Sequence, residues 1–213
     1  MRVAISVEGQ TEEEFVREVL AVHLRESGVE PTPVLLGVGR RSSRGGNVST
    51  QRLAEDMFRL FHDFDAVSSL VDFYGYRGKG EKTIDELEGQ LAGEVRRKLG
   101  AQWRSDRVFA YVQRHEFEGL LFSNVEAFAD AINASEQTVT ALRSIRASFA
   151  TPEEINDDRQ TAPSNRIKSV LRSYHKVRHG LLVAQTIGID VMLAECPRFS
   201  DWVKGLESLG KQS

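Results

Sequence analysis

The sequence predicts an α/β protein in which a parallel sheet of about four strands is flanked by helices and followed by a helical C-terminal part. Two observations carry this prediction. Up to about residue 116, apolar β-branched runs alternate with segments of helical periodicity, which is the pattern of strand-helix-strand units in a parallel sheet. Beyond that point only helical periodicity remains, so the strands are expected in the N-terminal part.

The first repeat of this pattern is a strand, a turn and a helix. Residues 2–7, RVAISV, are apolar and β-branched, as in a strand buried on both faces. Thr11 with Glu14 three residues later predicts a capping box, and apolar residues from Phe15 to Leu24 recur at helical spacing. We therefore expect a helix capped by Thr11.

Three more strands and two more helices complete the expected α/β part. The strands are predicted at 33–38, 66–74 and 107–113. One helix is expected around Leu53 to Leu60, and another opens at Thr83 with a second capping box. The alternation favours right-handed crossovers between parallel strands.

Two segments are expected in the domain organisation, an α/β core over 1–130 and a helical extension over 131–213 that packs on it as one structural unit. Pro152 and Pro163 interrupt the helical periodicity of the extension. The chain has 213 residues, of which 40% are hydrophobic and 28% charged, so it is long enough to bury a full core.

Charge and cysteine content narrow the class of protein. The net charge of −3 gives no global basic field, so an anionic partner has to be held by local groups. The single Cys196 excludes an internal disulfide, and the N-terminal segment turns acidic too early for a signal peptide. No run is long enough to span a bilayer, and we expect a cytoplasmic protein.

Acidic residues gather where the predicted strands end. Glu8 follows the first strand, Asp72 lies near the end of the third, and Glu116 and Glu118 follow the fourth. Ligands of open parallel sheets bind at the carboxyl ends of the strands, so we expect Glu8, Asp72 and Glu116 to share one edge. Gathered carboxylates need a compensating cation, and all-oxygen ligands favour Mg²⁺ or Mn²⁺.

Some of these acids have a structural alternative. Glu12, Glu13 and Glu14 lie in the expected first helical turn, where acidic side chains offset the helix dipole. We favour that role for Glu13 and Glu14. Glu8 precedes the expected cap, so the same explanation does not extend to it.

Several segments resemble, in the same order, a bacterial family, domain-of-unknown-function family 4276. They are VEGQTEEEFV, VDFYG, HEFEGLLFS, INDDRQTAPSNRI, HG at 179–180 and AECPRFSDWVKGLE, and together they span nearly the whole chain. This family is regarded as related to the TOPRIM fold of topoisomerases, primases and OLD-type nucleases. The resemblance therefore implies a TOPRIM-like core.

TOPRIM domains bind Mg²⁺ through a Glu after the first strand and an Asp-x-Asp after a later one. By this resemblance Glu8 is the first-strand Glu, Glu12 is the second acid of the arrangement in OLD-type nucleases, and Asp72 is the first Asp of the pair. Tyr74 stands where the second Asp would be. This departure leaves a one-metal or a degenerate site.

Residues after the fourth strand are candidates to replace the lost ligand. Glu116 is the expected replacement. His115 or Glu118 would lie outside the metal ligands and orient them by hydrogen bonds. The hypothesis that follows is Mg-dependent hydrolysis of phosphodiester bonds in nucleic acid, with Glu12 as an outer ligand or base.

Two basic, Gly-rich loops are candidates to hold the phosphate backbone. They contribute Arg40, Arg41 and Arg44 after the second strand, and Arg77, Lys79 and Lys82 after the third. The alternative for each of these cations is an ordinary solvated loop.

Two other classes of function stay open. One is a non-catalytic subunit with a degenerate acidic site that binds a partner protein or nucleic acid. Relatives of this kind lie beside ATPases of the SMC/AAA type in phage-defence systems, so the resemblance implies such a partner. The other is binding of a nucleotide or another phosphorylated ligand, without the P-loop run GxxxxGK[ST], which this sequence lacks.

Overall fold

The computed structural model describes residues 1–37, 48–156 and 160–211. Contacts within the chain divide it into two compact units, Met1–Gln113 with Trp202–Ser213, and Arg114–Asp201. All strands among the described residues lie in the first unit, and the second is built of helices.

The first unit alternates strands and helices, as the sequence predicts. Its elements are β1 (Arg2–Val7), α1 (Gln10–Phe15), η1 (Val16–Leu20), α2 (Ala21–Glu26), β2 (Glu30–Leu35), α3 (Thr50–Leu60), β3 (Ala66–Asp72), η2 (Phe73–Gly75), α4 (Ile84–Leu99), η3 (Gly100–Gln102), η4 (Ser105–Arg107), β4 (Val108–Phe109), β5 (Val112–Gln113) and the part of α10 (Pro197–Gly210) that begins at Trp202.

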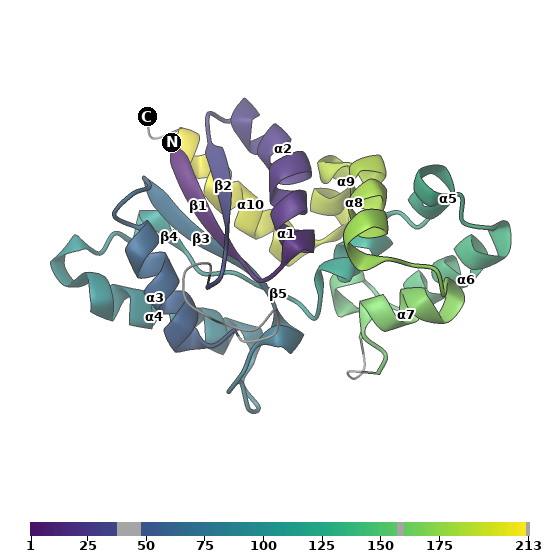
Figure 1. Ribbon diagram of the computed structural model, residues 1–213, viewed down its shortest axis with the longest axis horizontal. Helices are drawn as coiled ribbons and strands as arrows, with labels where there is room; N and C mark the ends of the chain where they lie inside the picture. Colours follow the sequence, from purple (N-terminus) through teal and green to yellow (C-terminus); the bar gives the residue numbers. More distant parts are fainter. Residues whose placement is uncertain (38–47, 157–159, 212–213) are drawn as a thin grey trace. The chain divides into compact units, whose positions relative to one another are not determined.

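The sheet is parallel, in the order β2-β1-β3-β4, with β5 also paired to β3. Figure 1 shows β2, β1 and β3 side by side. Central strand β1 is buried from Val3 to Val7, because neighbours pair with it on both edges and helices cover both faces. This arrangement confirms the predicted α/β class.

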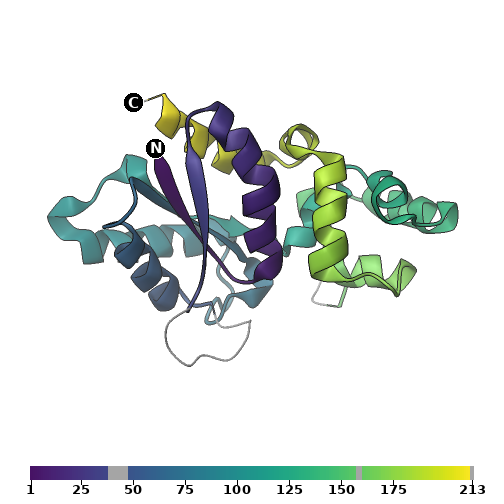
Figure 2. The same cartoon turned by 45° about the horizontal axis from the view of Figure 1, so that its top comes forward.

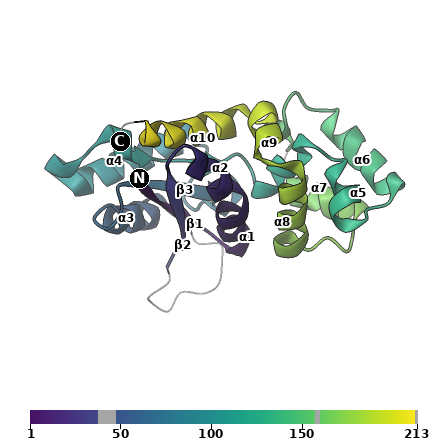
Figure 3. The same cartoon turned by 90° about the horizontal axis from the view of Figure 1, so that it is seen from above.

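Each face of the sheet has its own helices. Val67 and Val71 of β3 belong to the core under α3 and α4. Ser68, whose side chain points to the opposite face, accepts a hydrogen bond of 2.8 Å from Trp202 Nε1 of α10. His23 Nε2 of α2 lies 2.6 Å from Glu207 Oε1, so α2 and α10 share that second face. Figure 3 shows α10 and α3 on opposite sides of β1 and β3.

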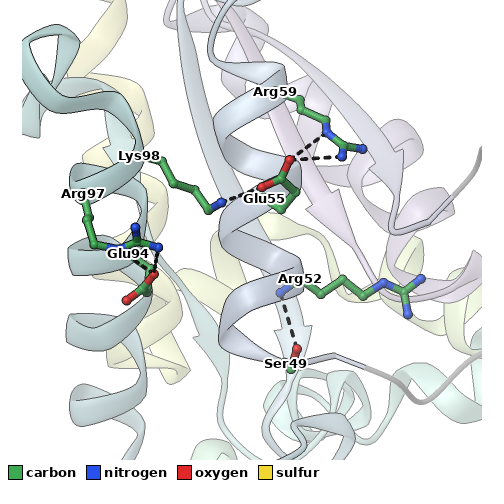
Figure 4. A network of polar contacts seen from close by, with 7 residues as sticks. All are labelled: Ser49, Arg52, Glu55, Arg59, Glu94, Arg97 and Lys98. Carbon is green, nitrogen blue, oxygen red and sulfur yellow. Dashed lines mark hydrogen bonds and ion pairs between the residues drawn. The ribbon is translucent and has the colours of Figure 1, made fainter.

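A surface network joins the two helices of the first face. Glu55 of α3 accepts hydrogen bonds from Arg59 one turn later and from Lys98 of α4, and Arg97 pairs with Glu94 within α4 (Figure 4). Exposed ion pairs of this kind contribute at most about 1 kcal/mol each. Most of the stability of the α3–α4 pair therefore comes from the apolar core beneath it.

The helix after β1 is continuous but not uniform. The segments α1, η1 and α2 form one helix from Gln10 to Glu26, drawn in purple to dark blue in Figure 2. Its central part, Val16–Leu20, is a π-helix, a feature often found near functional sites. The apolar spacing of the sequence predicts a helix here but does not reveal this change of winding.

The capping box predicted at Thr11 is wrong. The helix begins two residues earlier than predicted, with Gly9 as the N-cap in an extended conformation and no side-chain cap bond. Thr11 is therefore inside the helix and buried. Gly9 caps the helix without a side chain because glycine is tolerated at this position.

The edge strands differ in detail from their predicted positions. The second strand, β2, lies three residues before the predicted 33–38 and includes Pro31 and Pro33; proline lacks an N–H, and an edge strand tolerates that loss. The predicted fourth strand is two short strands in one register, β4 and β5. Ser69 Oγ accepts a hydrogen bond from Tyr111 N and donates one to Tyr111 O, in place of the ladder between them.

The second unit begins directly after β5. Its elements are η5 (Phe117–Ser123), α5 (Ala127–Ile132), α6 (Glu136–Arg146), η6 (Pro152–Glu154), α7 (Pro163–Val170), α8 (Lys176–Ile187), α9 (Ile189–Glu195) and the first residues of α10. This confirms the predicted helical C-terminal part.

Across the described ranges, no single helix has the length and apolar character needed to cross a membrane. Taken together, α8 and α9 pass that test by length and composition, with a bend of 84° between them.

The capping box at Thr83 is confirmed and can be tested. Thr83 Oγ1 accepts from Glu86 N at 3.2 Å, and the Glu86 carboxylate accepts from Thr83 N at 2.8 Å. We expect Thr83→Ala to lower the free energy of unfolding by about 1 kcal/mol in urea denaturation. Thr83→Ser keeps the accepting hydroxyl and is the control. Equal losses in both variants would contradict the cap.

Candidate functional site

The carboxyl ends of β1 and β3 form a topological switch point. From β1 the chain turns to β2 on one side, and from β3 it turns to β4 on the other. The helix after β1 and helix α4 after β3 cover opposite faces of the sheet. In open parallel sheets, ligands bind in the crevice at such a point.

Two of the predicted site residues leave the sheet at this switch point. Val7 is level with Leu70 in the parallel register of β1 and β3. Glu8 follows Val7 directly, and Asp72 is the last residue of β3. The structure therefore places Glu8 and Asp72 at the ends of neighbouring strands, as the sequence predicts.

The carboxylate of Glu8 lies against the backbone of Gly75. A methyl group built at Gly75 would stand 2.3 Å from Glu8 Oε2 and 2.7 Å from Oε1, which is far inside van der Waals contact. Any larger residue at this position would require the Glu8 carboxylate to move. Nothing in the sequence indicates this contact, since Gly75 in VDFYG is typical of an ordinary turn.

Negative charge at this edge is partly buried. Glu12 has 4% of its surface exposed, Asp72 has 8%, and Glu8 is half-buried. Glu12 Oε2 would lie 3.2 Å from a methyl group at Gly9, so its carboxylate folds back over the start of the helix. This position suits an acid that offsets the helix dipole and also keeps Glu12 beside Glu8 in the turn.

The basic loop after β3 is anchored to the same edge. Lys79 Nζ donates a hydrogen bond of 2.8 Å to Phe73 O and lies 4.1 Å from the centroid of the Phe73 ring and 4.9 Å from that of Tyr74. Arg77 is exposed and its N–H bonds Val48 O, whereas Lys82 is half-buried. Lys79 thus has a defined position against Phe73 and Tyr74, the two residues that follow Asp72.

The other predicted basic loop cannot be placed. Arg40, Arg41 and Arg44 lie outside the described residues.

Glu116 belongs to the second unit, where its carboxylate caps a helix. Glu116 Oε2 accepts a hydrogen bond of 3.0 Å from Ser164 N, in the first turn of α7. An acid at a helix N-terminus is stabilising, so Glu116 has a structural role within its own unit. The expectation that it joins Glu8 and Asp72 concerns both units and stays a prediction.

Glu118 is fully buried and forms an ion pair. Its Oε2 lies 3.0 Å from Lys176 Nζ, at the start of α8. Beside the pair, burial and the nearby Glu118 carboxylate raise the pKa of Tyr174 above its usual value. The Tyr174 hydroxyl is buried without a hydrogen-bond partner among the residues that the structure describes. Neither Lys176 nor Tyr174 was predicted as a partner of Glu118.

His115 adopts a left-handed backbone conformation, with φ of 67°. This conformation is uncommon outside glycine and costs some strain. Its Nδ1 lies 3.2 Å from Asn156 Nδ2. Asn156 precedes the segment 157–159, which lies outside the described part of the chain.

A second helix cap was missed from the sequence. Glu153, with 2% of its surface exposed, accepts hydrogen bonds from Arg198 N and Phe199 N in the first turn of α10. Burial raises the pKa of Glu153, and these two N–H groups oppose that rise. The nearest sequence signal was PEE in the interruption at Pro152, which indicates only a break in periodicity.

Within the described residues, no three His, Cys, Asp or Glu side chains are grouped closely enough to form a complete metal site. Mg²⁺ does not require one, because it usually keeps several waters and binds through one or two carboxylates plus substrate phosphates. The all-oxygen donors at the switch point fit such an ion in chemical type.

A comparison with protein-family models gives one match. The family described as "Domain of unknown function (DUF4276)" matches residues 7–207. No curated protein and no solved structure matches the chain.

The contact between Glu8 and Gly75 can be tested by a double-mutant cycle. Gly75→Ala forces the Glu8 carboxylate to move, so we expect it to lower the free energy of unfolding in the wild type but much less in a Glu8→Ala background. The coupling energy should lie at about 0.5–3 kcal/mol, the range for residues in contact. Additive effects would show that the two residues do not touch.

Gly89→Ala is the matched control for that cycle. A methyl group at Gly89 in α4 would meet nothing within 4 Å. Alanine in an exposed helix is more stable than glycine by up to about 1 kcal/mol, so this variant should be as stable as the wild type or more stable in either background.

The buried hydroxyl of Tyr174 should contribute little to stability. We expect Tyr174→Phe to leave the free energy of unfolding unchanged or to raise it by up to about 1 kcal/mol, because it removes a polar group without breaking a bond. Tyr76→Phe is the control, since Tyr76 Oη donates to Thr50 Oγ1 at 3.1 Å, and should lose about 1 kcal/mol. A larger loss for Tyr174→Phe would refute this account.

Proposed function

The chain belongs to the DUF4276 family, and we propose that it hydrolyses phosphodiester bonds of nucleic acid with the help of Mg²⁺ or Mn²⁺. The observation that carries the proposal is the gathering of Glu8, Glu12 and Asp72 at the switch point of the parallel sheet. A TOPRIM-like relationship, with Glu8 and Asp72 as the corresponding acids, and a cytoplasmic location are parts of the same proposal.

The acids have the chemistry that this activity needs. Glu8 and Asp72 are the residues that would hold the ion, and both supply hard oxygen donors. The bound ion would polarise the phosphate and lower the pKa of a water. Glu12, turned back over Gly9, would orient that water or accept its proton.

Charge supports the same conclusion. Two carboxylates are almost fully buried at this edge and a third is half-buried. Concentrated negative charge costs stability unless cations compensate it. Lys79, held against Phe73 directly after Asp72, supplies one positive charge in this loop, and a divalent cation would supply more.

One departure from the TOPRIM pattern favours a second function. Tyr74 occupies the place of an acid in the TOPRIM pattern, so the site has fewer carboxylates than a two-metal nuclease uses. The alternative is a non-catalytic subunit that binds nucleic acid or a phosphorylated ligand at this edge. In both cases an ATPase of the SMC/AAA type from a phage-defence system is the proposed protein partner.

The metal site is tested first by stability. We expect millimolar Mg²⁺ or Mn²⁺ to raise the melting temperature of the wild type, because a ligand stabilises the folded state that binds it. Glu8→Gln should keep or slightly raise the stability of the metal-free protein and lose this thermal shift. Glu14→Gln, an acid of the same helix with a predicted structural role, is the control and should keep the shift.

Activity decides between the two functions. Single- and double-stranded DNA and RNA are incubated with the protein and either metal, with and without an ATPase of the SMC/AAA type, the class of the proposed partner. The proposal expects cleavage that falls at least about tenfold in Glu8→Gln, the lower limit for residues that merely support metal ligands. A metal shift without cleavage under any condition would establish the binding subunit. A wild type with no metal shift and no cleavage would leave the acids structural.

A further inference from the structure

We propose that the second unit carries a surface for the phosphate backbone of nucleic acid, formed by the exposed cations Lys168, Arg172 and Arg178. They lie between the last turn of α7 and the first turn of α8, and none of them belongs to the candidate site described above. The inference rests on the proposed function only in taking nucleic acid as the anion. Binding at this surface needs no metal ion.

Positive charge is concentrated in one stretch of the sequence. Residues 160–189 contain no Asp or Glu, although the whole chain has more acids than bases, 31 against 28. The same stretch contains Arg166, Lys168, Arg172, Lys176 and Arg178. It therefore has a local basic character that the net charge of −3 conceals.

Two of these cations are used inside the unit. Arg166 Nε donates a hydrogen bond of 2.8 Å to Thr161 O. Lys176 Nζ lies 3.0 Å from Oε2 of the buried Glu118. Both side chains therefore have a structural role.

The other three cations are not used in this way. Lys168, Arg172 and Arg178 are exposed, and among the described residues no hydrogen bond or ion pair engages their side chains. The dipole of α7 accounts for Lys168, which lies in the last turn of that helix. It gives no reason for Arg172 or Arg178.

Arg172 lies at the tip of a turn between α7 and α8. Tyr174 N donates a hydrogen bond of 3.0 Å to Leu171 O, which closes the turn around Arg172 and Ser173. Tyr174 is buried, whereas both central residues are exposed. The turn is thus anchored at its base and presents a cation beside a serine, two residue types that bond phosphate oxygens in protein–DNA complexes.

Arg178 lies where a helix disfavours positive charge. It belongs to the first turn of α8, which contains no acid, and its N–H bonds Nδ1 of the N-cap His175 at 3.4 Å. The helix dipole repels cations at this end, and histidine is not among the preferred N-cap residues. The helix gains no stability from Arg178, and such a local conflict is expected where a residue serves function.

The positive potential at the start of α8 also acts on a histidine. Burial, and then the nearby Arg178 and His175, lower the pKa of His179. His179 Nδ1 accepts a hydrogen bond of 3.1 Å from His175 N, which requires that this nitrogen carries no proton. A phosphate bound here would offset the repulsion between these groups.

The surface fits a phosphate backbone better than a lipid bilayer. The exposed large hydrophobic residues among those described are Val22, Leu182 and Val191, and none of them lies between 163 and 179. Binding to a bilayer surface needs apolar groups that enter it beside the cations. Nucleic acid is held by cations and hydroxyl groups, and contacts to its backbone carry no sequence information. We therefore expect binding without sequence preference.

The test measures how salt affects binding of a labelled duplex and a labelled single strand to the full chain in EDTA. The wild type is compared with the triple variant Lys168→Gln, Arg172→Gln, Arg178→Gln. Each lost phosphate contact lowers the slope of log K against log salt by about 0.9 for a duplex and about 0.7 for a single strand, so the triple variant should lose about 2–3. No binding by the wild type, or an unchanged slope in the variant, would overturn the inference.

A matched variant separates this surface from net charge. Arg96→Gln, Arg104→Gln and Arg107→Gln together remove the same charge from exposed positions of the first unit and should keep the wild-type slope. An equal loss in both triple variants would show an effect of net charge alone and contradict the proposal.

A single variant excludes unfolding as the cause. Arg178→Gln removes a cation from the positive end of the α8 dipole, so its melting temperature should equal or exceed that of the wild type. Its slope for a duplex should still fall by about 0.9. A stable variant with the wild-type slope would exclude Arg178 from the surface.

A competitor and one further variant complete the test. Polyglutamate that displaces the nucleic acid at equal concentrations of charge would show a surface for acidic protein and overturn the inference. Glu8→Gln should bind in EDTA as the wild type does. If the slopes change as expected but no cleavage occurs, the surface stands and hydrolysis fails. If cleavage depends on Glu8 but the triple variant keeps the wild-type slope, hydrolysis stands and this inference fails.

Discussion

The parallel pairing of β1 with β3 is the constraint on which the rest of the candidate site depends. Five consecutive pairs, from Val3 with Ala66 to Val7 with Leu70, fix the two strands in register. Since side chains alternate between faces, a slip of one residue would turn the buried residues of β1 to the wrong side. The same register brings Glu8 and Asp72 out at one edge, and it brings η2 close enough for Gly75 to meet Glu8. The positions of the acids are thus a consequence of core packing.

The alternation of strands and helices was predictable because a doubly covered parallel sheet leaves a strong pattern in the sequence. Strand β1 and the cap at Thr83 appear as expected. The cap at Thr11 does not, because Gly9 starts the helix earlier and a glycine cap carries no side-chain signature. The break between β4 and β5 was hidden for a similar reason. The run 108–112, VFAYV, is apolar without interruption, and only the structure shows that the side chain of Ser69 replaces the ladder.

The sequence predicts the site residues that directly follow a strand, because the ends of strands can themselves be predicted. Glu8 and Asp72 follow from topology alone, whereas the carboxylates of the second unit depend on contacts between residues far apart in the chain. Glu116 bonds Ser164, Glu153 bonds the start of α10, and Glu118 pairs with Lys176. Two of these three carboxylates cap helices that begin with proline, at Pro163 and Pro197. An acid next to a sheet is therefore no guide by itself to chemistry in this chain.

The division of the fourth strand bears on how the sheet moves. Two short segments, each paired to β3 over two residues, have little ladder of their own, and a single hydroxyl spans the interval between them. Native proteins open first where few backbone bonds hold a segment. The amides of β4 and β5 should therefore exchange their hydrogens through small local fluctuations. Those of β1 should exchange only when the protein unfolds globally. This edge is the part of the sheet that can open locally while its centre stays folded.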